Sequence, residues 1–455
     1  MDKDKILRAK ELVNGISPSF CLAKWLQTTL YLQNGYNHSC HHPTPHKIPL
    51  EEIKNNPKAL HNTKYKKEKM KQMLKGERPS ECDYCWKIED LGKDYISDRY
   101  YKSGSHWALQ NLGNVLETGL DDIEPSYLEI SFSNVCNFKC VYCSPEISST
   151  WMKEVKKYGG YPTQDGFNSL DYLENQSKMP YDPNGENPYV DAFWEWWPDL
   201  YLNLHTLRLT GGEPLMSRDV WKIIDHVIKT PNPELTFCIN SNLCVQDRLI
   251  ESLIEKINLL EGKVKEIQIF SSGEAVGSQS EYIRYGLDYD KWMSNMNKLA
   301  SQTKGNVIIS NMTTVNLLSV PTFDTFIKEI LDLREKYNAT VSHNKIQFMI
   351  NYLRYPTFLA LPYLDNNTKN IFKTKIESLI EERGERYNGL GKLSFLEIDQ
   401  LKRLVDYTFT NEPEIEKNRK DFFVFVNEAD KRRNHNFKET FPELEDYYNI
   451  CQKNT

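Results

Sequence analysis

Three cysteines in one short run are the residues of this sequence best suited to chemistry. Cys136, Cys140 and Cys143 have the spacing CxxxCxxC and follow an alternating stretch that is typical of a strand. Three thiolates can bind three irons of a cubane cluster and leave the fourth iron without a protein ligand, free to bind a reactant. The alternatives are a structural zinc site, which usually needs a fourth ligand that is not evident nearby, and cysteines that only pack. The spacing favours an iron–sulfur cluster with one open iron.

A second motif, Gly211-Gly212-Glu213-Pro214, ends the apolar segment that starts at Leu207. Glycines at the end of a strand let the backbone come close to a ligand. The carboxylate of Glu213 can accept hydrogen bonds from an ammonium group. The motif therefore indicates a binding site at the end of this segment.

In this order, the two motifs resemble those of the radical S-adenosylmethionine superfamily, whose CxxxCxxC loop follows the first barrel strand and whose GGEP-type motif closes the second. The resemblance implies that the three cysteines bind a catalytic [4Fe–4S] cluster. It also implies that Gly211, Gly212 and Glu213 hold the amino group of S-adenosylmethionine. Tyr142 stands where the family has an aromatic residue near the adenine, and a packed surface aromatic is the alternative.

Further cofactor contacts are expected at the carboxyl ends of the strands, where barrel active sites lie. Polar side chains there can bind ribose hydroxyl groups, and the planar guanidinium of Arg284 suits the methionine carboxylate. Ordinary loop capping is the alternative. The candidates are Asn240, Ser241, Asn242, Ser271, Ser272 and Arg284.

Strand-like and helix-like segments that alternate along the chain must position these residues. This alternation predicts successive parallel βα units, and six strands predict a partial (β/α)6 TIM-like barrel of the α/β class, the version common in the superfamily. Apolar residues at intervals of three and four predict helices at 217–229, 246–257, 291–301 and 322–337. The predicted strands are residues 127–133, 206–210, 235–240, 266–271, 307–312 and 345–350.

The same pattern divides the chain into three expected parts. Residues 1–115 form an N-terminal iron–sulfur module, residues 116–350 the barrel, and residues 351–455 a mainly helical C-terminal extension. An insertion at 158–203 interrupts the barrel and carries the run Phe193-Trp-Glu-Trp-Trp197. These aromatic residues either pack as a helix face on the barrel or roof a substrate cavity.

Four further cysteines precede the barrel: Cys21, Cys40, Cys82 and Cys85. They could bind a second cubane cluster or a zinc ion. Their sequence context resembles the auxiliary-cluster modules called twitch or SPASM domains, placed here before the barrel as in a subfamily of radical enzymes. The resemblance implies a fully ligated auxiliary [4Fe–4S] cluster that transfers electrons or supports the structure. Three histidines near Cys40 could replace a thiolate or remain solvated, namely His38, His41 and His42.

The remaining cysteines are expected to have no role in catalysis. Cys238 and Cys244 flank the end of the third strand and are expected to be small buried groups. Cys451, near the C-terminus, is expected to be a free surface thiol; a hydrogen-atom donor is the alternative.

Composition limits the class of protein. The chain has 455 residues of which 39% are hydrophobic, enough for a sizeable core, and a net charge of -6, which argues against broad nucleic-acid binding. No apolar run is long enough for a membrane span and no secretion signal is evident. We expect a cytoplasmic protein that binds neither membrane nor nucleic acid.

The resemblance implies an enzyme that reductively cleaves S-adenosylmethionine to a 5'-deoxyadenosyl radical, which abstracts hydrogen from a substrate. A reductant of the ferredoxin or flavodoxin type is implied. Relatives with auxiliary modules often modify peptides, so a ribosomal peptide or protein is the expected substrate, and a carbohydrate or nucleotide-derived small molecule is the alternative. A non-catalytic iron–sulfur or zinc-binding module is the alternative from another class, and the GGEP motif argues against it.

Overall fold

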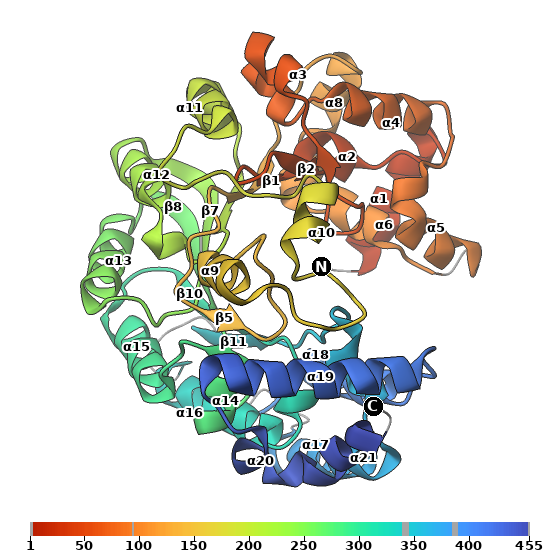
Figure 1. Ribbon diagram of the computed structural model, residues 1–455. Coiled ribbons are helices and arrows are strands. Elements are labelled where there is room, and N and C mark those ends of the chain that lie inside the picture. Colours follow the sequence, from red (N-terminus) through yellow and green to blue (C-terminus); the bar gives the residue numbers. More distant parts are fainter. Residues whose placement is uncertain (1–2, 93–94, 339–344, 385–389, 454–455) are drawn as a thin grey trace.

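The computed structural model describes residues 3–92, 95–338, 345–384 and 390–453 of the chain (Figure 1). Within these residues the largest element is a nine-stranded sheet with the strand order β11-β10-β8-β7-β6-β4-β1-β2-β3. Helices alternate with most of the strands along the chain. The predicted α/β class is therefore confirmed.

Six neighbouring strands of this sheet are parallel and correspond to the six predicted strands. Each lies next to the strand before it in the chain, as expected for successive βα units. β6 and β10 have the predicted bounds, whereas β7 begins three residues before the predicted start. The strands are β4 (Tyr127–Ser131), β6 (Thr206–Thr210), β7 (Asn232–Ser241), β8 (Val264–Ser272), β10 (Val307–Met312) and β11 (Ile346–Met349).

Alternating side chains explain how these strands separate an apolar face from a polar one. Leu207 and Leu209 are buried in the main core, and Arg208 between them points to the opposite face of the sheet. Ile223 and Val227 of α12 (Arg218–Lys229) belong to the same core. Figure 1 shows α12 and three further helices in an arc along the strands: α13 (Asp247–Leu259), α15 (Tyr289–Gln302) and α16 (Phe323–Asn338).

The N-terminal segment adds three strands that the sequence did not predict. β1 (Gln27–Tyr31) pairs in parallel with β4, with Thr29 opposite Glu129. β2 (Tyr36–His38) and β3 (His46–Lys47) continue the sheet in antiparallel pairs. The segment that carries Cys21 and Cys40 thus shares a sheet with the strand that precedes the CxxxCxxC loop.

Helices of the N-terminal segment enclose a second, smaller core. It contains Val13, Phe20, Trp25 and Met70, together with Cys82 and Cys85. Several short helices are needed to form such a core, because each helix buries only a few apolar side chains. The helices of this core are α1 (Lys3–Ile16), α2 (Leu22–Leu26), α4 (Lys64–Leu74), η2 (Ser80–Cys82), α5 (Asp83–Asp90), α6 (Asp98–Ser103), α7 (His106–Leu109) and α8 (Leu112–Thr118). Two others of the segment, α3 (Leu50–Asn55) and η1 (Pro57–Leu60), bury Ile53 and Leu60 in the main core.

The segment between β4 and β6 holds three helices: α9 (Ser149–Tyr158), α10 (Leu170–Asn175) and α11 (Pro188–Tyr201). Asn187 caps α11 by accepting hydrogen bonds from the N–H groups of Tyr189 and Val190. Phe193, Trp196 and Trp197 of α11 are buried in the main core. The aromatic run therefore packs as a helix face, one of the two predicted arrangements.

The C-terminal segment is mainly helical and contacts the region of the CxxxCxxC loop. The guanidinium of Arg433, at the end of α19 (Ile415–Arg433), donates to the Lys139 carbonyl at 3.1 Å and binds the Glu154 carboxylate of α9 at 3.2 Å. The other helices of this segment are η5 (Thr357–Leu359), η6 (Leu361–Tyr363), α17 (Asn366–Arg383), α18 (Phe395–Thr408), α20 (Phe437–Thr440), η7 (Pro442–Leu444) and α21 (Glu445–Lys453).

Across the described ranges, no helix has both the length and the apolar composition that a membrane span requires.

Candidate active site

Hydrogen bonds from the start of α9 position the CxxxCxxC loop, which leaves β4 at its carboxyl end. The N–H of Cys136 donates to the Ser149 Oγ at 3.1 Å, and the Trp151 Nε1–H donates to the Cys140 carbonyl at 2.8 Å. A turn brings the N–H of Cys143 within 2.9 Å of the same Cys140 carbonyl. Trp151 is fully buried, so the helix and the loop form one packed unit.

The donor set of this loop fits an iron–sulfur cluster. Burial raises the pKa of the Cys143 thiol to about 12, and it also raises the pKa values of Cys136 and Cys140. Ionised Cys140 raises the pKa values of Cys136 and Cys143, and ionised Cys143 raises the pKa of Cys136, so the three thiols lie within electrostatic reach of each other. Buried thiols that repel each other as thiolates need cationic metal to hold all three charges.

Arg284 lies beside the second cysteine of the loop. It belongs to β9 (Arg284–Tyr285), which pairs with β5 (Lys139–Cys140) so that Arg284 is opposite Cys140. The Arg284 Nη1 is 4.0 Å from the Cys140 Sγ. Its positive charge lowers the pKa of Cys140 against the stronger effect of burial, and it therefore favours the thiolate.

The guanidinium of Arg284 binds a carboxylate of the chain. The Nη2 is 2.5 Å from the Glu274 Oε2, and the Nε is 3.0 Å from the Oε1. The Tyr142 hydroxyl donates to the same Glu274 Oε1 at 3.1 Å. Glu274 was not selected from the sequence, and the role of Arg284 toward the methionine carboxylate stays a prediction. Glu274 and Arg284 are ten positions apart with α14 (Gly277–Ile283) between them, so no periodic pattern reveals the pair.

Backbone hydrogen bonds join the GGEP motif to the CxxxCxxC loop. The Glu213 N–H donates to the Val135 carbonyl at 2.7 Å, and the Gly212 N–H donates to the Ser133 carbonyl at 3.3 Å. A Cβ on Gly212 would lie 2.4 Å from the Val135 oxygen, and Gly211 has a φ of +127°. The glycines are thus required for the close approach of two backbone segments.

The side chain of Glu213 is buried and accepts hydrogen bonds from its own neighbourhood. The Ser241 hydroxyl donates to the Oε1 at 2.9 Å, and the Asn242 N–H donates to the Oε2 at 2.7 Å. Burial raises the pKa of Glu213 to about 7, against the hydrogen bonds that lower it. A carboxylate has about four acceptor positions, so these bonds and a third from the Leu215 N–H leave room for one more donor.

The other predicted cofactor contacts divide into two groups. Asn242 is near the loop, because its Nδ2 donates to the Asn137 Oδ1 at 2.8 Å, and Ser241 contacts Glu213. Asn240 and Ser271 bind other parts of the sheet: Asn240 accepts from Arg208 at 3.0 Å, and the Ser271 hydroxyl accepts from Asn311 at 3.3 Å. Ser272 is half-buried at the end of β8.

The polar face of the sheet carries an arginine that the sequence analysis did not select. Arg208 donates to Asn240, its Nη2 is 3.1 Å from the Met312 sulfur, and its guanidinium lies 4.3 Å from the centre of the Phe270 ring. Glu129 is opposite Arg208 in the register of β4 and β6. The available signal was a charge between two apolar residues, as in Leu207-Arg208-Leu209.

Buried oxygen atoms on this face have no hydrogen-bond partner among the described residues. They belong to β1, β4 and β10 and lie on the same face of the sheet as Arg208, as the strand register shows. Buried polar atoms are usually satisfied, so such a group indicates a place where water or a polar ligand binds. The atoms are the Oγ1 of Thr29, the Oε2 of Glu129, the Oγ of Ser131 and the Oγ of Ser310.

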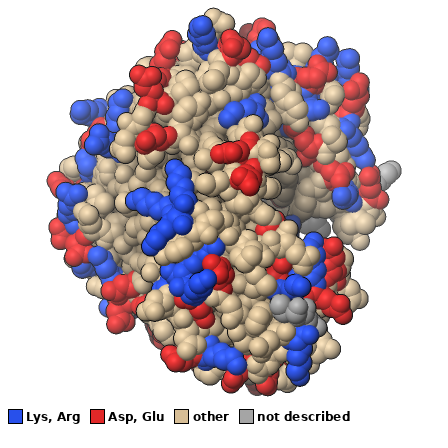
Figure 2. Space-filling model, in the orientation of Figure 1, with Lys and Arg blue, Asp and Glu red and all other residues tan. Residues whose placement is uncertain are grey.

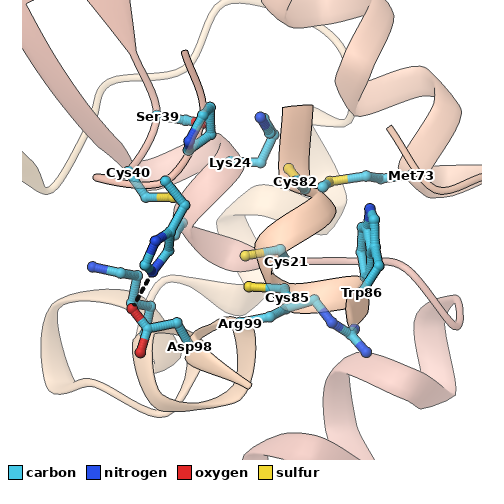
Figure 3. Close-up of a pocket in the computed structure, with 14 residues that line it drawn as sticks. Cys21, Lys24, Ser39, Cys40, Met73, Cys82, Cys85, Trp86, Asp98 and Arg99 are labelled. Carbon is cyan, nitrogen blue, oxygen red and sulfur yellow. Dashed lines mark hydrogen bonds and ion pairs between the residues drawn. The ribbon is translucent and has the colours of Figure 1, made fainter. Parts of the chain in front are cut away.

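The four N-terminal cysteines line a single pocket (Figure 3). Cys21 precedes α2, Cys40 follows β2, and Cys82 and Cys85 lie at the end of η2 and in the first turn of α5. Burial raises the pKa values of Cys82 and Cys85 to about 12. Every pair among the four thiols is close enough for the charge of one to affect another. The structure thus brings together all four predicted ligands.

Cations line the same pocket. Lys24, Arg99 and Lys102 line it together with the thiols. Burial opposes the charge of Lys24, but Cys82 and Glu81 outweigh it and hold the pKa of Lys24 above its usual value. A pocket with four thiols and three cationic side chains suits an anionic occupant, such as a cluster bound by four thiolates.

The three histidines near Cys40 have separate positions. The Nδ1 of His38 contacts the Cys40 carbonyl, and burial lowers the pKa of His38 to about 4. His41 Nε2 is 4.0 Å from the Glu129 Oε2. His42 lines the cysteine pocket, pairs with Asp98 at 2.7 Å and stacks on the Tyr84 ring.

The prediction that Cys451 is a surface thiol is wrong. The residue is 0% exposed, whereas a surface thiol was expected. Cys451 lies four residues after Tyr447 on α21, and both side chains face the core, because this amphipathic helix buries one side. Cys238 and Cys244 are buried, as predicted.

No group of three or more His, Cys, Asp or Glu side chains in the described ranges has the geometry to hold a single metal ion. In a cubane cluster each thiolate binds its own iron, so the sulfur atoms do not converge on one point. Both cysteine sets remain suitable for clusters.

Comparison with known proteins gives partial matches. No protein family model matches the chain. The GTP 3',8-cyclase of Cronobacter sakazakii is 31% identical over 112 residues, which is 23% of this chain and 24% of the relative. The GTP 3',8-cyclase of Yersinia pestis is 34% identical over 108 residues, which is 23% of each chain. That of Aeromonas hydrophila is 28% identical over 125 residues, which is 28% of this chain and 29% of the relative.

The similarity supports the radical S-adenosylmethionine superfamily. It agrees with the motifs and with the large parallel sheet. The chain spans about a quarter of the length of these relatives.

Proposed function

We propose that this chain is a radical S-adenosylmethionine enzyme that abstracts hydrogen from a small, nucleotide-derived or carbohydrate substrate. The observation that carries the proposal is the pair of backbone hydrogen bonds between the GGEP motif and the CxxxCxxC loop. These bonds place a buried carboxylate, that of Glu213, next to a loop of three thiols. This is the arrangement that a cofactor with an ammonium group and a metal-bound end would need.

The residues of the chain have distinct tasks in this proposal. Cys136, Cys140 and Cys143 hold the catalytic cluster, and Glu213 accepts hydrogen bonds from the methionine amine. Ser241 and the Asn242 N–H orient the Glu213 carboxylate. With both groups bound, cluster and cofactor supply one-electron cleavage of the sulfonium carbon–sulfur bond, which gives methionine and a 5'-deoxyadenosyl radical.

The polar face supports a small substrate. Arg208 and Glu129 offer one positive and one negative group on adjacent strands, and several buried oxygen atoms on the same face have no hydrogen-bond partner within the described part of the chain. Such a surface fits a compact molecule with phosphate or hydroxyl groups. The GTP in the name of the relatives also favours a nucleotide-derived molecule over the peptide expected from the sequence.

The four N-terminal cysteines are proposed to bind a second cluster. Four thiolates leave no open iron, so this cluster would transfer electrons or stabilise the N-terminal part rather than bind the substrate. Residues 1–115 are proposed as the auxiliary module, residues 116–350 as the partial barrel, and residues 351–455 as its C-terminal extension.

Iron content and cofactor cleavage test the function directly. Protein reconstituted without oxygen is expected to bind about eight irons per chain, and about four when the three loop cysteines are changed to alanine. Under dithionite, the wild type should form 5'-deoxyadenosine from S-adenosylmethionine, and Cys140→Ala should form none. Full cleavage by Cys140→Ala would contradict the proposal, and zinc in place of half of the iron would contradict the auxiliary cluster.

The substrate class needs a separate experiment. Turnover with a panel of nucleotides, sugar phosphates and synthetic peptides is followed by mass spectrometry, with deuterium transfer into 5'-deoxyadenosine as the second measure. A labelled nucleotide or sugar that gives deuterated 5'-deoxyadenosine supports the proposal. Transfer from a peptide alone would replace it with the peptide or protein substrate.

A further inference from the structure

The outer surface of α9 is strongly basic. Lys153, Lys156 and Lys157 are exposed there, and their spacing places them on one side of the helix. Trp151 and Val155, on the opposite side, are buried in the main core, and Trp151 also binds the loop of the three cysteines. We name the three exposed lysines the α9 lysine face.

A further cation extends this surface. Lys431 of α19 is 80% exposed, and the neighbouring Arg432 donates to the carbonyls of Gly159 and Gly160, which end α9. Figure 2 shows Lys and Arg side chains gathered where Figure 1 places α9 and the adjacent end of α19. The whole chain has a net charge of -6, so this surface is opposite in sign to the molecule as a whole.

Carboxylates neutralise little of the α9 lysine face. Glu154, on the same helix, is buried and bound to Arg433 and Lys139. Glu428 binds Arg432 at 2.7 Å and lies 4.0 Å from Lys431. Among the described residues, no carboxylate pairs with Lys153, Lys156 or Lys157. Their charges are therefore available to a partner.

The α9 lysine face is also close to the catalytic cysteines. α9 begins six residues after Cys143, and the indole of Trp151 binds the Cys140 carbonyl through the helix. An α-helix with its side chains is about 10–12 Å across. A protein docked on the outer side of α9 would thus be about one helix diameter from the Cys140 segment.

We propose that the α9 lysine face docks an acidic, low-potential one-electron carrier protein. This rests on the proposed function, because reductive cleavage of the sulfonium bond consumes one electron that the chain itself cannot supply. The carrier is oxidised by one electron, and that electron breaks the carbon–sulfur bond of S-adenosylmethionine. A basic surface on an acidic protein attracts an acidic carrier and directs it to this side of the molecule.

The test compares two reductants of one enzyme. 5'-Deoxyadenosine formation is measured with dithionite and, separately, with a bacterial flavodoxin and its reductase. In the variant Lys153→Glu/Lys156→Glu/Lys157→Glu, the flavodoxin-driven rate at low salt should fall by about tenfold or more. The dithionite-driven rate should stay at the wild-type value, and the difference between variant and wild type should shrink at high salt.

Three exposed lysines provide the matched control: Lys64 and Lys71 of α4, and Lys75, which follows α4 directly. Their change to glutamate alters the net charge by the same amount and should leave both rates unchanged. A flavodoxin-driven rate that is equal in the α9 variant and the wild type would overturn the proposal. A loss in the α4 variant alone would move electron entry to the N-terminal cysteines and would overturn it as well.

Two further measurements separate docking from folding and from the proposed function. If the glutamate variant loses iron, the variant with glutamine at the same three positions replaces it in the test. Its flavodoxin-driven rate should decrease less than that of the glutamate variant. Flavodoxin affinity is also measured by titration calorimetry, which needs no turnover. If the wild type binds flavodoxin through α9 but cleaves no S-adenosylmethionine under dithionite, the proposed function is refuted and the docking surface is retained. If the variant and the wild type bind flavodoxin with equal affinity, the docking surface is refuted.

Discussion

The N–H of Glu213 donates to the carbonyl of Val135 at 2.7 Å, so the residue expected to bind the cofactor amine is fixed to the residue before Cys136. The two motifs that resemble those of the superfamily are therefore one structural unit. A displacement of either backbone segment displaces the other.

Gly212→Ala should disrupt this unit. The added Cβ would lie 2.4 Å from the Val135 oxygen, and that oxygen belongs to backbone, which cannot move away easily. We expect a loss of about 1–3 kcal/mol in the free energy of unfolding and weaker iron binding by the loop. Gly113→Ala on α8 is the control, because a Cβ there has nothing within 4 Å. Equal unfolding midpoints and iron contents for the two variants would contradict this prediction.

Arg284→Met should destabilise the protein strongly. Glu274 is 1% exposed, and without Arg284 its carboxylate would be a buried, unpaired charge. Such a loss costs about 3–5 kcal/mol, and the double variant Arg284→Met/Glu274→Gln should recover much of it. Urea unfolding of the cluster-free protein measures the free energy of unfolding of the single and the double variant.

The control for this pair is an exposed ion pair. Lys87 and Asp83 are 77% and 56% exposed, so Lys87→Met should change the free energy of unfolding by less than about 1 kcal/mol. An effect of Arg284→Met as small as that of Lys87→Met would show that the buried pair is not required.

The affinity for S-adenosylmethionine should rise with pH. Burial raises the pKa of Glu213 to about 7, and only the carboxylate can bind the methionine ammonium well. Affinity should increase by about tenfold between about pH 6 and about pH 8, because the ionised fraction increases by that factor. Calorimetric titration of the cluster-loaded protein measures it.

Glu213→Gln separates this effect from other titrations. The variant should bind more weakly and with little dependence on pH. The same pKa shift affects stability. The pKa of Glu213 in the folded protein is raised from 4.5 to about 7, so its ionisation opposes folding. The stability of the cofactor-free protein should therefore fall as the pH rises from 4.5 to about 7. A wild-type affinity that does not change with pH would rule out the role of this carboxylate.

Cys82→Ala/Cys85→Ala should remove one cluster and leave the other. Iron content should fall from about eight to about four per chain, whereas unproductive 5'-deoxyadenosine formation should persist and substrate conversion should decrease. Cys451→Ala is the control and should keep all of the iron. Because cluster binding can stabilise the fold, circular dichroism and gel filtration must first show an intact protein. An unchanged iron content would refute the auxiliary site.

Local patterns predicted the strands well where the two faces differ. Thr206–Thr210 alternates in burial throughout, and Val307–Met312 does so over its first three residues, so the period of two is visible in the sequence. β1 escaped prediction because four of its five residues are buried, which removes the alternation, and because its partner β4 is far along the chain. Short strands such as β3 carry too few residues for any period.

The cysteines and the GGEP motif could be predicted because their spacing is local. The hydrogen-bond and ion-pair partners of the predicted residues could not be predicted, because these partners depend on tertiary contacts. Glu274 meets Arg284 after the chain has passed through α14 (Gly277–Ile283). Arg208 of β6 meets Asn240 of β7 and Met312 of β10. These contacts depend on the tertiary arrangement of several elements, which no single segment contains.

The pairing of β1 with β4 has a consequence for dissecting the protein. β4 lies between β1 and β6, so a fragment that starts after residue 115 would leave one side of β4 without hydrogen-bond partners. Exposed strand edges recruit other chains and promote aggregation. Because β1 and β4 are separated by roughly a hundred residues, we expect their pairing to form late in folding. The strand that leads into the CxxxCxxC loop is therefore completed by the segment that holds the other four thiols, and we expect the two parts to unfold together.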